Sequence, residues 1–243
     1  MLNIKRQTGF TLVEIAIVLV IIGLLLGGIL KGQELINSAR VRNLADQNSG
    51  IQAAYYGFID RYRQVPGDFQ GGSATAPASV AIGQLINLPA TASTTAGNGR
   101  IDHTLEEAAA VWEQLSKSNF IGGGFTPASS APTISTYPTN APRNAFNGAL
   151  VLTRNDGYTG TAAERLTLHL GTNIPVSIAR ELDVKVDDGK PTTGILRLSA
   201  AVTSSATTFD TLFTTSTTPA CIDATPDYDI TNDAQDCGQV FLY

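Results

Sequence analysis

The chain has 243 residues, with 16 lysines and arginines against 21 aspartates and glutamates, and a formal net charge of −5. This acidic balance excludes a large basic surface of the kind that binds nucleic acid. Two histidines and two cysteines leave little material for a metal or haem centre. The length allows one or two domains.

The N-terminal segment is predicted to be a membrane-spanning helix. An apolar run extends from Phe10 to Leu30, and as a helix it would be roughly 31 Å long, matching a bilayer core of about 30 Å. Lys5 and Arg6 precede the run, so the positive-inside rule places the N-terminus in the cytoplasm. An ordinary secretory signal has a shorter apolar region and then a cleavage site, whereas this run continues into a helical pattern.

Glu14 is the only charge in the apolar run. An acidic side chain at mid-membrane costs about 2.5–3.5 kcal/mol, so its presence needs an explanation. The stretch Gly9-Phe10-Thr11-Leu12-Val13-Glu14 resembles the processing signal of type IV prepilins and of the related pseudopilins of type II secretion systems. The resemblance implies that a prepilin peptidase cuts between Gly9 and Phe10 and N-methylates Phe10.

The resemblance also divides the chain into parts. It implies a cleaved basic leader over 1–9 and a transmembrane or filament-core helix over 10–30. An amphipathic continuation of that helix follows over 31–63, and an exported globular head occupies 64–243.

Cleavage at Gly9 would expose a positive amine at Phe10, which offers Glu14 a partner. In a bundle of packed helices, Glu14 of one subunit can pair with the Phe10 amine of a neighbour, and the pair then sets the axial register of assembly. The other interpretation is that Glu14 pairs only with the N-terminus of its own helix. We favour the pairing between subunits.

The helix is expected to run on to Arg63, because residues 31–63 contain no proline. Ile51, Tyr55, Phe58 and Tyr62 follow helical spacing and predict a buried stripe. Many type IV pilins carry a proline where this chain has Lys31, and its absence favours the pseudopilin class. Four glycines in or near the apolar run favour close helix packing: Gly23, Gly27, Gly28 and Gly32.

The head is predicted to be α+β, with the long N-terminal helix packed on an antiparallel sheet, as the resemblance implies. A polar loop is expected over 69–100. Thr104 to Glu107 form a capping box that begins a helix, which Gly122 to Gly124 would end. A second helix is favoured over 175–186, although this segment also alternates like a strand. Predicted strands cover 149–153, 165–170, 194–202 and 240–243.

Cys221 and Cys237 enclose 15 residues near the C-terminus. An even cysteine count in an exported protein favours a disulfide between them. The resemblance connects this feature with type IV pilins, in which a C-terminal disulfide commonly bounds a variable surface loop, and major pseudopilins usually lack it. Asp227, Asp229 and Asp233 in the loop are calcium candidates by their spacing, although a glycine and a glutamate of the known calcium loops are missing.

Neither histidine lies in a recognisable nucleophile or zinc motif, and the chain has no phosphate loop, so we expect no enzyme and no cofactor. The main hypothesis is a structural subunit of a type IV pilus. The alternatives are a pseudopilin of a type II secretion system and an anchored binding protein that never polymerises. The resemblance implies other pilin copies, a prepilin peptidase and an inner-membrane platform as partners. It implies an inner-membrane precursor that ends in a surface pilus or periplasmic pseudopilus.

Overall fold

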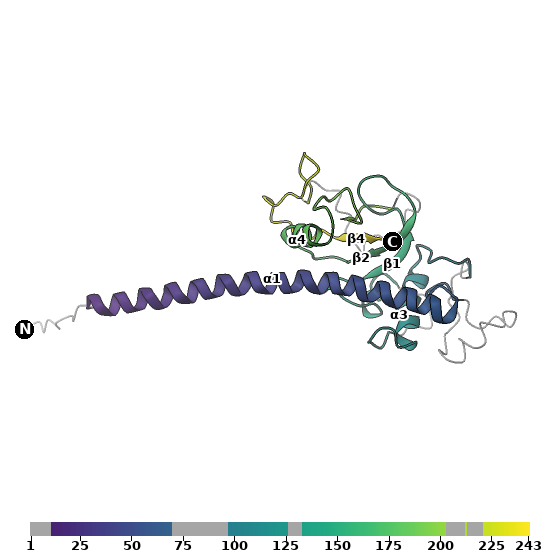
Figure 1. The fold of residues 1–243 in the computed structure, drawn as a ribbon, viewed down its shortest axis with the longest axis horizontal. Coiled ribbons are helices and arrows are strands. Elements are labelled where there is room, and N and C mark those ends of the chain that lie inside the picture. The colour runs from purple at the N-terminus through teal and green to yellow at the C-terminus, as the bar shows by residue number, and fades with distance from the viewer. Residues whose placement is uncertain (1–10, 70–96, 126–132, 203–211, 213–220) are drawn as a thin grey trace, which may run out of the picture. The chain divides into compact units, whose positions relative to one another are not determined.

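The computed structural model describes residues 11–69, 97–125, 133–202, 212 and 221–243 (Figure 1). The chain divides into two compact units, residues 1–40 and 41–243. The leader, Gly9, Phe10 and most of the loop expected over 69–100 lie outside the described residues. The elements are, in chain order, α1 (Leu12–Tyr62), α3 (Leu105–Lys117), the short 3-10 helix η1 (Tyr137–Thr139), β1 (Val151–Asn155), β2 (Arg165–His169), α4 (Val176–Val186), β3 (Leu196–Leu198) and β4 (Gln239–Leu242).

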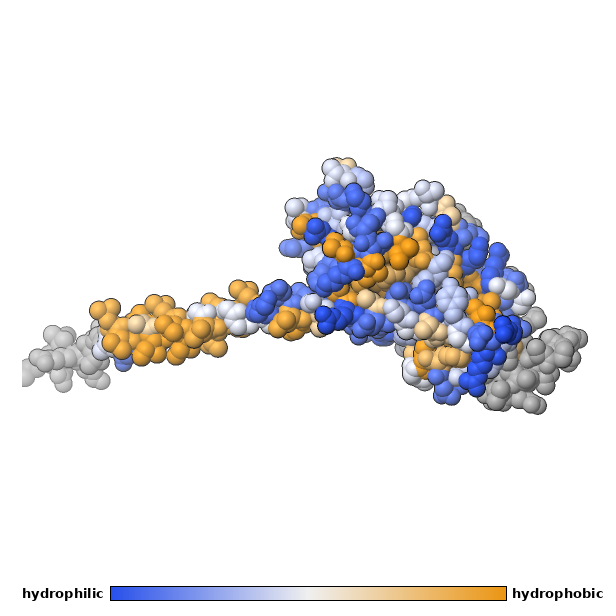
Figure 2. Space-filling view, in the orientation of Figure 1, coloured by the Kyte–Doolittle hydropathy of each residue, from blue (hydrophilic) through white to orange (hydrophobic). Residues whose placement is uncertain are grey.

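In the first unit, α1 is regular and its apolar side chains are exposed. Leu12, Leu24 and Leu30 each expose two thirds or more of their surface. Figure 2 shows the N-terminal part of α1 as a mostly hydrophobic surface, which gives way to hydrophilic residues further along the helix. Within the described chain, α1 is the one helix long and apolar enough to cross a membrane by length and composition. The predicted apolar helix is therefore present.

In the second unit, the remainder of α1 contributes one side to the hydrophobic core. Its buried residues recur at helical spacing and are Val41, Leu44, Ile51, Ala54 and Phe58. Tyr55 and Tyr62 of the predicted stripe are half-buried and pack against the same core. Arg63, with a left-handed φ of 55°, follows the last helical residue. The helix therefore ends where the sequence predicts.

The sheet is antiparallel throughout and has the order β1-β2-β4-β3. Leu168 of β2 lies opposite Leu152 of β1 on one side and Phe241 of β4 on the other. All three side chains are fully buried. The α+β expectation, a long N-terminal helix with an antiparallel sheet, is confirmed.

Helix α3 begins at the predicted capping residue. The Thr104 hydroxyl accepts from the N–H of Glu107, and the Glu107 carboxylate accepts from the N–H of Asp102 at 2.6 Å. The helix ends at Lys117, before the glycines expected to end it. Asn119 adopts a left-handed φ of 64° and turns the chain earlier. Trp112 is buried, as expected, and donates to the Tyr137 hydroxyl at 2.9 Å.

The other boundaries differ by small amounts. Helix α4 is present, with Pro175 as its N-cap and not its first residue. Strand β1 begins two residues later than expected, and β3 covers only Leu196–Leu198 of the predicted 194–202. Beyond Leu198, the N–H of Ser199 still donates to Gly238 beside β4, whereas the N–H of Ala200 donates to Gly157, so the chain leaves β4 after Ser199.

Candidate processing and assembly segment

The start of α1 is held by a capping box between Thr11 and Glu14. The backbone N–H and the hydroxyl of Thr11 both donate to Oε2 of Glu14, at 2.9 and 2.8 Å. In return, the N–H of Glu14 donates to the Thr11 hydroxyl at 3.3 Å. This is the T-x-x-E arrangement that satisfies the free donors at a helix N-terminus.

Both donors converge on one carboxylate oxygen of Glu14. Within the described residues, Oε1 accepts no hydrogen bond, and the Glu14 side chain is exposed. The carboxylate is therefore partly satisfied by its own helix and still has one oxygen for a cation. The pairing between subunits and the pairing with the N-terminus of the same helix both stay predictions.

The glycines of the apolar helix lie in open space in the single chain. A Cβ added at Gly23, Gly27, Gly28 or Gly32 would meet nothing within 4 Å. At about 100° per residue, the pair Gly23 and Gly27 lies on one face, and the pair Gly28 and Gly32 lies about 140° away. Small-xxx-small pairs let helix backbones approach closely in membranes. The helix thus offers two separate faces for close packing.

The C-terminal loop is closed by the predicted Cys221–Cys237 disulfide. It is also fixed to the segment before α4. Val176 donates its N–H to Ala234 at 2.9 Å, and Cys237 donates its N–H to Ile174 at 2.7 Å. The disulfide therefore closes the loop, and backbone hydrogen bonds hold the loop to the segment before α4.

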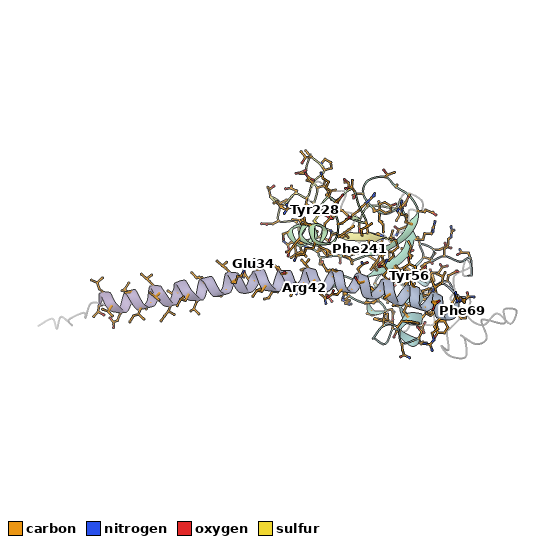
Figure 3. All side chains as sticks on the ribbon, in the orientation of Figure 1. Glu34, Arg42, Tyr56, Phe69, Tyr228 and Phe241 are labelled. Atoms are coloured by element: carbon orange, nitrogen blue, oxygen red, sulfur yellow. A yellow bond between two sulfur atoms is a disulfide. The ribbon has the colours of Figure 1, made fainter. Side chains whose placement is uncertain are left out.

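Tyr228, labelled in Figure 3, is the buried anchor of this loop. Its hydroxyl donates to Oδ2 of Asp183 in α4 at 2.7 Å and accepts from Nε2 of Gln239 in β4 at 2.9 Å. Burial raises the pKa of Asp183 to about 6, against a hydrogen bond from Tyr228 that lowers it. Burial, with the nearby Asp183 charge, raises the pKa of Tyr228 as well.

Two of the calcium candidates have partners of their own. Asp227 forms an ion pair with Lys190 at 3.8 Å, and Asp229 accepts from the hydroxyl of Thr231 at 2.6 Å. The structure does not gather these two and Asp233 into one carboxylate group. In the described part of the chain, the acidic side chains whose oxygens lie within 4.8 Å of one another are Asp183, Asp187 and Asp188. Calcium binding at the loop stays a prediction.

The group around Asp187 builds the connection between α4 and β3. Asp187 accepts from the N–H of Leu196 at 2.9 Å, and Asp188 accepts from the N–H of Lys190 at 2.9 Å and the hydroxyl of Thr193 at 2.5 Å. Hydrogen bonds from Thr193 lower the pKa of Asp188. These hydrogen bonds fix Asp187 and Asp188 in the turn that joins α4 to β3.

A hydrogen-bonded series lies inside the head. Nδ1 of His169 is 3.1 Å from the Ser199 hydroxyl, and Nε2 of His169 is 3.0 Å from Nδ2 and 3.3 Å from Oδ1 of Asn155. This order of groups resembles a nucleophile, base and orienting residue. All three side chains are at most 1% exposed. Burial also holds the pKa of His169 well below its ordinary value.

Comparison with known proteins identifies the N-terminal segment. Residues 4–30 match the family model described as the prokaryotic N-terminal methylation motif. The apolar helix and this motif together fit a membrane-anchored precursor that carries a prepilin-type signal. The match supports a type IV pilin-like or pseudopilin protein, a class processed by a peptidase and assembled into filaments. No match was found among curated proteins or solved structures.

The sequence analysis did not predict two features of the structure. The box at Thr11 has the same T-x-x-E spacing that predicts the start of α3, so a local signal was present. The pair Asp183 and Tyr228 is 45 residues apart in the chain and has no local signal.

Proposed function

We propose that this protein is a structural subunit of a type IV pilus. In this proposal the chain is cut after Gly9, N-methylated at Phe10 and polymerised through the helix that begins at Leu12. The observation that carries the proposal is the methylation motif at 4–30, which overlaps the start of a helix whose apolar side chains are exposed along the first unit. Exposed apolar surface on this scale requires a membrane or a bundle of similar helices.

The C-terminal loop favours the pilus over the secretion system. The Cys221–Cys237 bridge closes an exposed loop that includes Asp223, Thr225 and Ile230. A closed C-terminal loop of this kind is the feature that the family resemblance connects with type IV pilins. In the proposal this loop is the surface that meets other molecules once the subunit is in a filament.

A pseudopilin of a type II secretion system is the second candidate. The observation that favours it is the regular helix through Lys31, the position at which many type IV pilins have a proline. The Lys31 ammonium forms an ion pair with Glu34 at 2.6 Å on the helix surface. Exposed pairs of this kind contribute little stability, so the pair does not decide between the candidates.

The proposal treats the chain as the substrate of a prepilin peptidase and not as an enzyme. The burial of Ser199, His169 and Asn155 supports this assignment, because the one nucleophile-like series described above has no access to solvent. The proposed partners are other copies of the chain, related pilins and an inner-membrane assembly platform. The proposed route runs from a single-pass inner-membrane precursor to a filament, without general nucleic-acid binding or a cofactor.

Mass spectrometry of filaments sheared from the source organism tests the proposal. We expect a subunit that begins at Phe10 with one added methyl group. A subunit that begins at Met1 in the filaments would overturn the proposal. A processed subunit found only in membranes would point to the anchored protein that never polymerises. Filaments confined to the periplasm of a secreting cell would identify the pseudopilin.

Glu14→Ala tests the role of the acid in assembly. We expect normal cleavage and a large reduction in filament yield, because the charge that sets the register is lost. Normal filaments from Glu14→Ala would contradict that role.

A further inference from the structure

We propose that a pocket beside α1 in the head receives the Tyr56 side chain of a second copy of this chain. The contact would be head-to-tail, because the pocket and Tyr56 lie on different sides of α1. This inference rests on the proposed function, since it concerns how subunits pack against one another in a filament.

The pocket lies between α1, the turn after α3 and the segment before β1. It has a volume of about 270 Å³, and Gly50, Ile51, Phe120, Ile121 and Leu150 give it a mostly apolar lining. A Cβ added at Gly50 would meet nothing within 4 Å, so the glycine leaves the α1 side of the pocket open. Drug-sized ligands occupy pockets of about 300–1,000 Å³, so this pocket suits one large side chain.

The pocket also contains a polar group without a donor. Nε2 of Gln47 donates to the carbonyl of Arg143 at 2.9 Å, which leaves Oε1 of the same amide as an acceptor. Oε1 is buried and accepts no hydrogen bond from the described residues. A buried acceptor is unfavourable until a donor reaches it. The pocket therefore favours an apolar side chain that carries one donor over a purely apolar side chain.

Tyr56, labelled in Figure 3, is a side chain of this kind on the same protein. It is 52% exposed, and in the part of the chain that the structure describes it is the one exposed aromatic side chain. At about 100° per residue, Tyr56 lies about 120° from Gly50 and about 180° from Gln47 around α1. Because it points away from the pocket of its own chain, a second copy must supply the ring.

The charges beside the pocket and beside Tyr56 are complementary. Arg143 follows the lining residue Pro142 and is exposed, and within the described residues its guanidinium donates to neutral groups and forms no ion pair. Asp60 lies one helical turn beyond Tyr56, is 84% exposed and has only a long ion pair with Arg63, at 3.7 Å. A copy that inserts Tyr56 brings a carboxylate towards a guanidinium, which favours this partner.

The position of the two parts determines the kind of assembly. Each subunit would offer Tyr56 to one neighbour and its pocket to another. Such a heterologous contact forms a ring if the rotation closes and an open helical filament if it does not. The inference therefore assigns to polymerisation a specific contact in the head, outside the apolar run.

Cross-linking of filaments of the full chain tests the contact with Tyr56 and the pocket left intact. Asp60→Cys and Arg143→Cys are combined in one chain, whose native cysteines are bonded to each other. Arg143 contacts Gln47, and residue 60 is about 20 Å further along α1, so a short thiol cross-linker cannot join the two positions within one chain. We expect a ladder of covalent oligomers joined between positions 60 and 143. Dimers joined only 60 to 60 or 143 to 143 would overturn the inference.

Substitutions in the two parts test their contribution to assembly. We expect Tyr56→Ala and Gly50→Leu to be cleaved and methylated normally and to reduce the share of processed subunit in filaments roughly fivefold or more. Gly50→Leu would place a side chain at the open side of the pocket. Tyr56→Phe keeps the ring and loses the donor, so its loss should be smaller. Val184→Ala changes a side chain of similar exposure on α4 and should assemble as wild type does.

The proposed function and this inference fail in different ways. Wild-type chain absent from filaments overturns both. Wild-type filaments together with normal assembly of Tyr56→Ala overturn only the contact. Normal assembly of Tyr56→Ala with a loss in Gly50→Leu would assign the pocket to another occupant and would also overturn the contact.

Discussion

Asp183→Asn is expected to change how the free energy of unfolding depends on pH. The Asp183 side chain is fully buried in α4 and accepts from Tyr228 at 2.7 Å and from the N–H of Gly189 at 3.1 Å. Asparagine has nearly the same size and one oxygen acceptor, and it does not ionise. The substitution therefore removes the titration and keeps most of the packing.

The size of the effect follows from the raised pKa. Burial raises the pKa of Asp183 from 3.8 to about 6. A carboxyl whose pKa is raised by folding binds its proton more tightly in the folded chain. Its contribution to stability is therefore complete below about pH 4 and is lost as the pH rises through 6. One pKa unit is about 1.4 kcal/mol. Because the neighbouring Asp188 is exposed to solvent, we expect about 2 kcal/mol and not the full value for two units.

Urea unfolding of the full chain in detergent micelles measures this effect. Trp112, the single tryptophan, is buried in the head and reports its unfolding by fluorescence. Between pH 4 and pH 7.5, wild type should lose about 2 kcal/mol more than Asp183→Asn. Asp233→Asn, on the exposed C-terminal loop, is the control and should follow wild type at both pH values. If the free energies of unfolding of wild type and Asp183→Asn differ by the same amount at pH 4 and at pH 7.5, the reasoning is refuted.

Three further changes test other parts of the molecule. Replacing both Cys221 and Cys237 with serine should lower the free energy of unfolding by about 3 kcal/mol, the value for a closed loop of this length, in the same urea experiment. Asp68→Ala should cost about 2–4 kcal/mol in thermal unfolding, because its carboxylate accepts from the backbone N–H groups of residues 97, 98 and 99 at 2.5–3.1 Å. Gly27→Leu should leave the amount of processed subunit in membranes unchanged and reduce filament yield, since a Cβ added there meets nothing within 4 Å in the single chain. Normal filaments from Gly27→Leu would show that this face makes no close contact.

The parts of the fold that follow local rules could be predicted from the sequence. The start of α3 follows from the Thr104 hydroxyl, which accepts from a residue three positions later. Helix α4 follows from Ile178 and Leu182, which are both buried on its inner side. The order of the strands could not be predicted, because Leu168 pairs with Leu152 and with Phe241, and the second partner is more than 70 residues away. The alternating pattern identifies a strand and says nothing of its neighbour.

The candidate site divides in the same way. The apolar run, Glu14 and the signal around Gly9 are local patterns, and the family match covers them. The burial of Asp183 is not local. Asp183 stands between Leu182 and Val184, of which one is buried and the other exposed, so the helical pattern alone does not place it inside. Its carboxylate accepts from Tyr228 of the C-terminal loop, whose hydroxyl accepts in turn from Gln239 of β4.

An acid that is fully buried on a short helix therefore indicates that another segment covers it. Here that segment is the loop that the Cys221–Cys237 bridge closes, and the Tyr228 hydroxyl supplies its direct contact with Asp183. Ionisation of Asp183 is unfavourable in the folded chain. The attachment of the loop to α4 and the protonation of the Asp183 carboxylate are therefore energetically linked. Tyr228→Phe would remove this contact and keep the ring, so it should raise the pKa of Asp183 further and steepen the loss of stability with rising pH. Carboxyl titration by NMR measures that shift, and an unchanged pKa would show that the hydroxyl does not stabilise the carboxylate.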